Sequence, residues 1–132
     1  MASHTFTVKT QRRNQIVDIT AEVGRFVAQH APEEGICSVY VPHATAAITI
    51  NENADPQVCE DILDALGKLA PQGVWRHDRV DGNADAHIKA SLIGPGQAIP
   101  VRGGKLLLGT WQAIMLVELD GPRTRTVHLT LR

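Results

Sequence analysis

Short stretches of alternating apolar and polar residues recur along this chain, and they limit its fold more than any other feature. The clearest runs from Thr124 to Leu131, with Val127 and Leu129 on the same face as Leu131. Such alternation is typical of a strand that buries one side. Comparable segments are separated by turns rich in glycine, proline and asparagine, and the helical segments come singly. The pattern predicts an α+β fold with largely antiparallel sheet and two or three helices.

The boundaries of the expected strands and helices lie where this alternation changes to apolar residues spaced three or four apart. Asp55 followed by Pro56 is a strong helix start, because a capping carboxylate precedes proline at the first helical position. Thr20 and Asn83 are the expected caps of two further helices. The expected strands are 4–10, 15–19, 36–42, 46–51, 99–101, 105–108, 112–119 and 124–131, and the expected helices are 20–30, 56–69 and 84–93.

Length and composition limit the class of protein. A chain of 132 residues with a 43% apolar share suits one folded domain, residues 1–132. The net charge of −1 and the scattered basic residues argue against nucleic-acid binding. No apolar run approaches the ~20 residues that a membrane helix needs, and no signal-peptide core is present. Cys37 and Cys59 form no CxxC pair, so we expect reduced thiols and a cytoplasmic protein.

Three of the six histidines lie where elements begin or end, which is where sites are usually built. They are His43 between two expected strands, His77 in a polar loop, and His87 one turn into the last helix. Imidazoles bind zinc and manganese, with nearby carboxylates completing such sites. The spacing matches no standard zinc motif, so a shared metal site and separate structural histidines both remain open.

The stretch from Asp81 to Gly94 is polar where the last helix begins and then turns apolar, with Ile88 and Leu92 expected on the inner side. Asp85 has two interpretations. A carboxylate in the first turn is favoured by the helix dipole alone, and it is equally a candidate site residue. The free N–H groups of the same turn favour phosphate, which makes Asn83 a candidate for phosphate binding.

The segment after residue 103 is the other dense one. Glu118 shares a strand face with apolar residues, so this acid must be paired, protonated or near solvent, and it is a candidate site residue. Arg123 and Arg125 suit either an anion or a salt-bridged surface. The adjacent pair Arg12 and Arg13 indicates a solvated turn.

Three segments in this order, HATAAITINENAD, GNADAHIKASLIG and LGTWQAIMLVELDGPRTR, closely resemble the YjbQ-like family, whose members are often labelled secondary thiamin-phosphate synthase enzymes. The resemblance covers nearly the whole chain. It implies two packed antiparallel sheets with helices, a homotrimer, and a pocket lined by histidines near a subunit boundary.

The resemblance also implies site residues. Together with the patterns above it gives three groups. The candidate catalytic residues are His87, Glu52 and Glu118; the candidate substrate- or phosphate-binding residues are Thr45, Asn83, Asp85, Gln112 and Arg123; and the candidate metal ligands are His43, His77 and His87.

Three functions are compatible with these residues. The first is a slow transferase that joins a pyrimidine diphosphate to a thiazole phosphate and releases pyrophosphate, a reaction that usually uses magnesium. The second is a metal-dependent hydrolase of another phosphorylated or amide substrate, for which histidines favour zinc or manganese. The third is a non-catalytic module that holds a metal or a small anion. The expected partners are a small phosphorylated substrate and two further copies of the chain, with no nucleic acid and no membrane.

Overall fold

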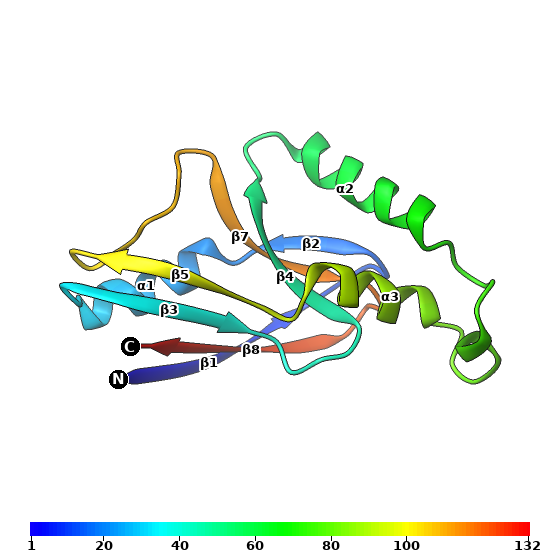
Figure 1. Ribbon diagram of the computed structural model, residues 1–132, viewed down its shortest axis with the longest axis horizontal. Coiled ribbons are helices and arrows are strands. Elements are labelled where there is room, and N and C mark those ends of the chain that lie inside the picture. Colours follow the sequence, from blue (N-terminus) through cyan, green and yellow to red (C-terminus); the bar gives the residue numbers. More distant parts are fainter.

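Two antiparallel sheets form the framework of the molecule (Figure 1). The computed structural model describes residues 1–132. One sheet has five strands in the order β1-β8-β3-β5-β6, and the other has three in the order β2-β7-β4. The strands are β1 Ala2–Lys9, β2 Gln15–Asp18, β3 Glu34–Tyr40, β4 Ala46–Glu52, β5 Gly96–Arg102, β6 Lys105–Leu106, β7 Gln112–Glu118 and β8 Thr124–Leu131. The helices are α1 Thr20–His30, α2 Pro56–Leu69 and α3 Ala84–Ile93, with a 3-10 turn, η1, at Arg76–Arg79. The predicted α+β class is confirmed.

The main core lies between the two sheets and is closed by α1. Val127, Leu129 and Leu131 of β8 point into it, as their alternation predicts. Leu116 of β7 and Phe26 of α1 complete the same cluster. Each such side chain contributes roughly 1.5–3 kcal/mol on burial, so this layer holds the sheets together.

The helices α2 and α3 lie on the β4 side of the molecule and cover the outer face of the three-stranded sheet (Figure 1). Ala86 and Ala90 of α3 pack with Val117 of β7, and Cys59 of α2 packs with Met115. Strand β7 is therefore buried on both faces from its second residue onward, so its sequence is nearly all apolar. No helix in the structure is long and apolar enough to span a bilayer.

The outer face of the five-stranded sheet is exposed, and its centre carries no charge. In register across the strands lie Ser38 with Thr130, and Tyr40 with His128, which also faces Thr5. The charged residues of this face stand at its margins, namely Lys9, Glu34, Arg102, Lys105 and Arg132. The centre of this face is thus polar but uncharged.

Two local predictions about the helices were wrong. Leu92, expected inside, is 62% exposed, and the buried positions of α3 are instead Ala84, Asp85, Ala86, Lys89 and Ala90. Alanines bring the helix close to the sheet, and the two charged residues are buried because they pair. The caps at Thr20 and Asn83 are also absent: Asp18 accepts from the Thr20 N–H, and Asp78 accepts from the Ala84 N–H.

The predicted cap of α2 is confirmed, since Asp55 accepts from the N–H of Gln57 at 2.9 Å.

Candidate functional site

The site is built where β7 ends beside the start of β4, with Glu118 opposite Ala46. Glu118 is fully buried and paired with Arg125 of β8, whose Nε donates to Oε1 at 2.9 Å. Thr10 donates its hydroxyl to the same oxygen at 2.7 Å. The other oxygen accepts two backbone N–H groups, from residues 119 and 120.

Burial would raise the pKa of Glu118, but the hydrogen bonds from Arg125 and Thr10 outweigh it and hold this pKa below its ordinary value. The carboxylate is thus charged at neutral pH, and both of its oxygens are occupied. In this structure Glu118, a predicted catalytic residue, anchors Arg125.

Arg125 connects this pair to the turn that carries His43. Its Nη2 donates to the carbonyl of Thr45 at 3.1 Å and to the Thr45 hydroxyl at 2.8 Å. Thr45, a predicted substrate-binding residue, is only 7% exposed. The structure therefore places it in the inner wall of the site, facing Arg125.

The His43 side chain binds the backbone of β8 beyond the point where β3 ends. The β3–β8 ladder ends at the pair Tyr40 and His128. Beyond that end, the N–H of Thr126 donates to Nε2 of His43 at 2.9 Å. A neutral imidazole that accepts at Nε2 carries its proton on Nδ1. Burial, and then the charge of Arg125, lower the pKa of His43, which favours this neutral form.

His43 and His87 line one depression of about 240 Å³. The remaining lining residues are small or apolar apart from one serine: Ala44, Ala46, Ala90, Ser91 and Pro95. No carboxylate is among them. The Ser91 hydroxyl donates to the carbonyl of His87 at 2.8 Å, which leaves its oxygen as an acceptor.

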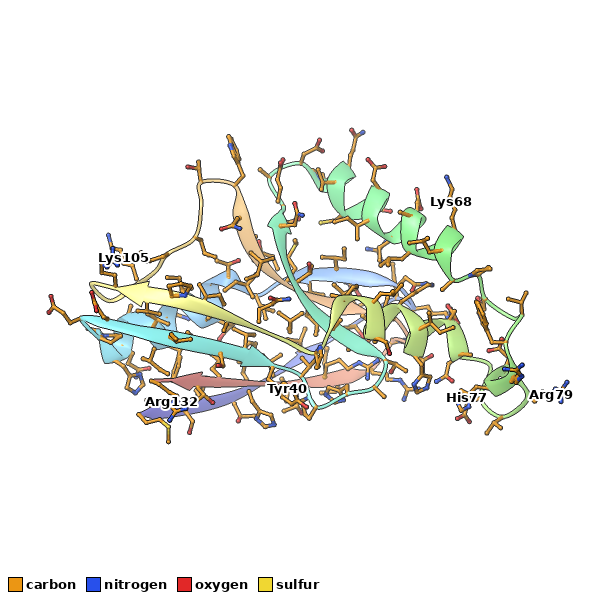
Figure 2. All side chains as sticks on the ribbon, in the orientation of Figure 1. Tyr40, Lys68, His77, Arg79, Lys105 and Arg132 are labelled. Atoms are coloured by element: carbon orange, nitrogen blue, oxygen red, sulfur yellow. The ribbon has the colours of Figure 1, made fainter.

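His77 lies on the other side of His87. The two rings meet edge to face, with centroids 5.0 Å apart. Together with Trp75, Ala84 and Ile88 they line a second, mostly apolar depression of about 300 Å³. Figure 2 shows His77 on the segment that projects between α2 and α3. The structure thus brings His77 to His87, and His87 borders both depressions.

Asp85 is fully buried between two cations. Arg13 binds both of its oxygens, at 3.1 and 3.2 Å, and the Lys89 ammonium is 2.9 Å from Oδ2. Burial alone would raise the pKa of Asp85, but these hydrogen bonds lower it. Asp85 therefore ties α3 to the turn before β2, and both of its oxygens are bound by protein cations.

The other predicted phosphate-binding residues near α3 bind each other through Asp120. Asn83 donates to Oδ2 of Asp120 at 2.8 Å, and Arg123 donates to the same oxygen at 3.1 Å. The first N–H of α3 is taken by Asp78 at 3.0 Å. These contacts occupy the first N–H of α3 and the Asn83 amide nitrogen, whereas the Arg123 side chain stays 54% exposed.

Glu52 and Gln112 lie away from the histidines. They face each other at the far end of the β4–β7 pair, six residues from Ala46 and Glu118. At about 3.3 Å per residue, roughly 20 Å separates the two ends. A single chain therefore does not bring Glu52 or Gln112 to His43 and His87.

The residues of one chain do not fit a metal ion. No group of three histidine, cysteine, aspartate or glutamate side chains has the geometry to hold one. The Nε2 lone pair of His43 is already used by Thr126, and Nδ1 carries the proton. His43 thus keeps Nδ1–H as a hydrogen-bond donor without a protein partner.

Sequence reasoning missed two partners of the buried acids. Arg13, expected in a solvated turn, binds Asp85 from 72 residues away. For Arg125 the sequence left two interpretations open, an anion site and a surface salt bridge. In the structure Arg125 is only 4% exposed and is paired with Glu118. One signal was available, because Arg125 alternates with Val127 and Leu129 on the buried face of β8.

Residues 4–132 match the family model described as UPF0047 protein YjbQ-like. The chain belongs to the YjbQ family. It is 46% identical over 126 residues to a UPF0047 protein of Methanocaldococcus jannaschii, covering 96% of this chain and 91% of that relative. UPF0047 protein YugU of Bacillus subtilis is 43% identical over 130 residues, with 96% of each chain covered.

Solved structures show the same YjbQ fold. A hypothetical protein of Aeropyrum pernix K1 has a TM-score of 0.95 at 47% identity, covering 100% of this chain and 98% of the other. A YbjQ-like protein of unknown function from Sulfolobus solfataricus P2 has a TM-score of 0.95 at 41% identity, covering 98% and 95%. The comparisons identify the family and the fold, and they assign no activity.

Proposed function

We propose that the depression between His43 and His87 binds the phosphate group of a small phosphorylated molecule. The observation that carries this proposal is the hydrogen bond from Thr126 to His43, which leaves Nδ1–H as a donor beside a depression without carboxylates. An anion accepts hydrogen bonds and a metal ion requires lone pairs, so this lining favours the anion.

The reaction we propose at this site is slow thiamin-phosphate formation, as the family resemblance implies. In this reaction a C–O bond of the pyrimidine diphosphate breaks, pyrophosphate leaves with the electron pair, and the thiazole nitrogen forms the new C–N bond. The Nδ1–H donor of His43 would stabilise the departing charge, and His87 lines the same depression. Among the predicted catalytic residues, His87 is the one that borders both depressions.

A metal site that uses His43, His77 and His87 finds less support than an anion site. One chain offers the pair His77–His87 but no third ligand. Zinc or manganese would need further ligands from a second copy, and magnesium would need the oxygens of the substrate itself. The metal-dependent hydrolase is accordingly the alternative to be tested.

We also propose that the protein is a homotrimer, the assembly that the resemblance implies. The outer face of the five-stranded sheet has no charged residue at its centre and exposes Ile36 and Tyr40, which supports self-association through this face. Assembly would also give the distant pair Glu52 and Gln112 a route to the histidine site, on a neighbouring copy.

The test is an assay of thiamin phosphate from the two purified precursors, with and without magnesium, on the parent and on His87→Ala. We expect product from the parent and none above the no-enzyme control from His87→Ala. The midpoint of thermal unfolding should stay within a few degrees, because a polar site residue adds little packing. His30→Ala, an exposed histidine of α1, is the matched control and should retain parental turnover.

Two results would redirect the proposal. If the parent forms no product, the synthase activity is excluded, and release of inorganic phosphate would indicate a hydrolase instead. If His87→Ala keeps parental turnover, the activity belongs to another site.

A further inference from the structure

We propose that the buried pair Glu118–Arg125 is a positioning unit for His43, which holds the neutral ring as its Nδ1–H tautomer. The importance of this tautomer for ligand binding rests on the proposed function. The tautomer itself does not, because it is a property of the free protein.

The chain of contacts is continuous and almost entirely buried. Glu118 is held by Thr10 and by two backbone N–H groups, and it binds Arg125 through both oxygens. Arg125 in turn holds the carbonyl and the hydroxyl of Thr45, two residues after His43. The side chains of Glu118 and Arg125 are 0% and 5% exposed. The turn at residues 43–45 is thereby fixed against β8.

The strand β8 then sets the orientation of the ring. Arg125 and Thr126 are consecutive in β8. Arg125, which binds Thr45, therefore also fixes the position of the Thr126 N–H that donates to Nε2 of His43. Free histidine in water favours the opposite tautomer, with the proton on Nε2. The hydrogen bond to Thr126 reverses this preference, and Nδ1 has no protein partner, which leaves its proton for a ligand.

Glu118 acts in this arrangement through Arg125, and so it is a positioning residue. The geometry also explains why an acid and an arginine are kept inside an apolar layer. A buried ion pair adds little stability over an apolar pair of the same volume, so a role in fixing a nearby group is a reason for its presence.

Nitrogen-15 NMR of the free protein at pH 8, with the imidazole nitrogens labelled, tests this inference. The two-bond couplings to the ring protons separate the tautomers. We expect a pyrrole-type signal for Nδ1 of His43 and a pyridine-type signal for Nε2. A pyrrole-type Nε2 would overturn the inference. The exposed ring of His4 serves as internal reference.

The positioning role is tested in Arg125→Lys, which keeps the charge beside Glu118 but lacks the second nitrogen that reaches Thr45. We expect the two His43 signals to move toward the averaged values of free histidine. Arg25→Lys, the same change in an exposed ion pair on α1, should leave them unchanged. A folded Arg125→Lys protein with parental His43 signals would overturn the role of the pair.

A milder pair of variants covers the case in which Arg125→Lys does not fold. Thr45→Val removes the hydroxyl that accepts from Arg125, and Thr45→Ser restores it. The signals should shift in the first and return in the second. Identical signals in both would contradict the inference. These NMR measurements are made on the free protein. A failure of phosphate binding or of the product assay would therefore not change their interpretation.

Discussion

At the scale of single residues, His43 makes the free energy of unfolding depend on pH. Its pKa is lowered in the folded protein, so the unfolded chain takes up a proton first as pH falls through about 6.5. The free energy of unfolding should therefore decrease from pH 6.5 down to the folded pKa, by at most about 1.4 kcal/mol per pH unit, and His43 should add no further loss below it.

Urea unfolding of the parent and of His43→Gln across pH 5 to 8 measures this effect. Glutamine places an acceptor near the position of Nε2 but does not titrate, so the His43 step should be missing from the His43→Gln curve and should appear as the difference between the two curves. A parent curve that runs parallel to that of His43→Gln throughout would contradict the assignment.

Glu118 and Asp85 produce a separate loss at lower pH. The pKa of each is lowered by folding, so their contribution is complete above the ordinary carboxyl values and is lost as pH falls through the folded values. Two steps, one below pH 6.5 and one below about pH 4, are therefore expected in the parent.

Neutralising Asp85 should also lower stability considerably. Asp85→Asn would leave Lys89 buried without its counter-charge and remove the double contact with Arg13. We expect a loss of about 3 kcal/mol in the free energy of unfolding. The exposed Asp64→Asn on α2 should change it by less than about 0.5 kcal/mol. Equal losses in both would show that the buried network contributes nothing.

At the scale of elements, two glycines give opposite predictions. A Cβ at Gly121 would lie 2.3 Å from the carbonyl oxygen of Arg12 and 2.8 Å from Cγ of Glu118, whereas a Cβ at Gly24 in α1 meets nothing within 4 Å. Gly121→Ala should lower the midpoint of thermal unfolding because backbone and the site pair must shift. Gly24→Ala should raise stability by about 0.5–1 kcal/mol, since alanine favours a helix. Calorimetry measures the midpoint of thermal unfolding of both proteins. An equal midpoint for Gly121→Ala and Gly24→Ala would contradict the close packing at Gly121.

The elements themselves could be predicted from the sequence because their signals are local. The alternation in β8 and the Asp55–Pro56 start of α2 need no knowledge of the rest of the chain. The buried face of α3 could not be predicted in this way. It depends on Arg13, which lies 72 residues away, and a polar Asp85 is read as exposed until that partner is known.

The two histidines of the candidate site could be singled out from the sequence, but their hydrogen bonding could not. His43 and His87 stand at element ends, which is visible in the sequence. The donor role of His43 depends on the backbone N–H of Thr126, and a backbone group leaves no mark in a sequence. The separation of Glu52 from the histidines likewise follows from the pairing register of β4 and β7, which the sequence does not show.

At the scale of the whole molecule, the neutral sheet face makes assembly sensitive to charge. Ser38 lies at its centre, between Thr130 and Ala98. We expect light scattering of the parent to give three times the 14.3 kDa chain mass. Ser38→Glu should shift the protein toward the monomer because three buried carboxylates would have no partner. Ala65→Glu, an exposed position on α2, should leave the mass unchanged. A monomeric parent at micromolar concentration would contradict the trimer.

Calorimetric titration with inorganic phosphate, in buffer containing a metal chelator, tests the central claim most directly. The parent should bind at one site per chain, and chelation should not change the affinity, because the donors come from the protein. His43→Leu keeps roughly the volume of the ring but has no hydrogen-bond donor, so its affinity should fall at least tenfold, whereas His30→Ala should bind as the parent does. Phosphate binding that is unaffected in His43→Leu, or absent from the parent once metal is removed, would contradict an anion site built on His43.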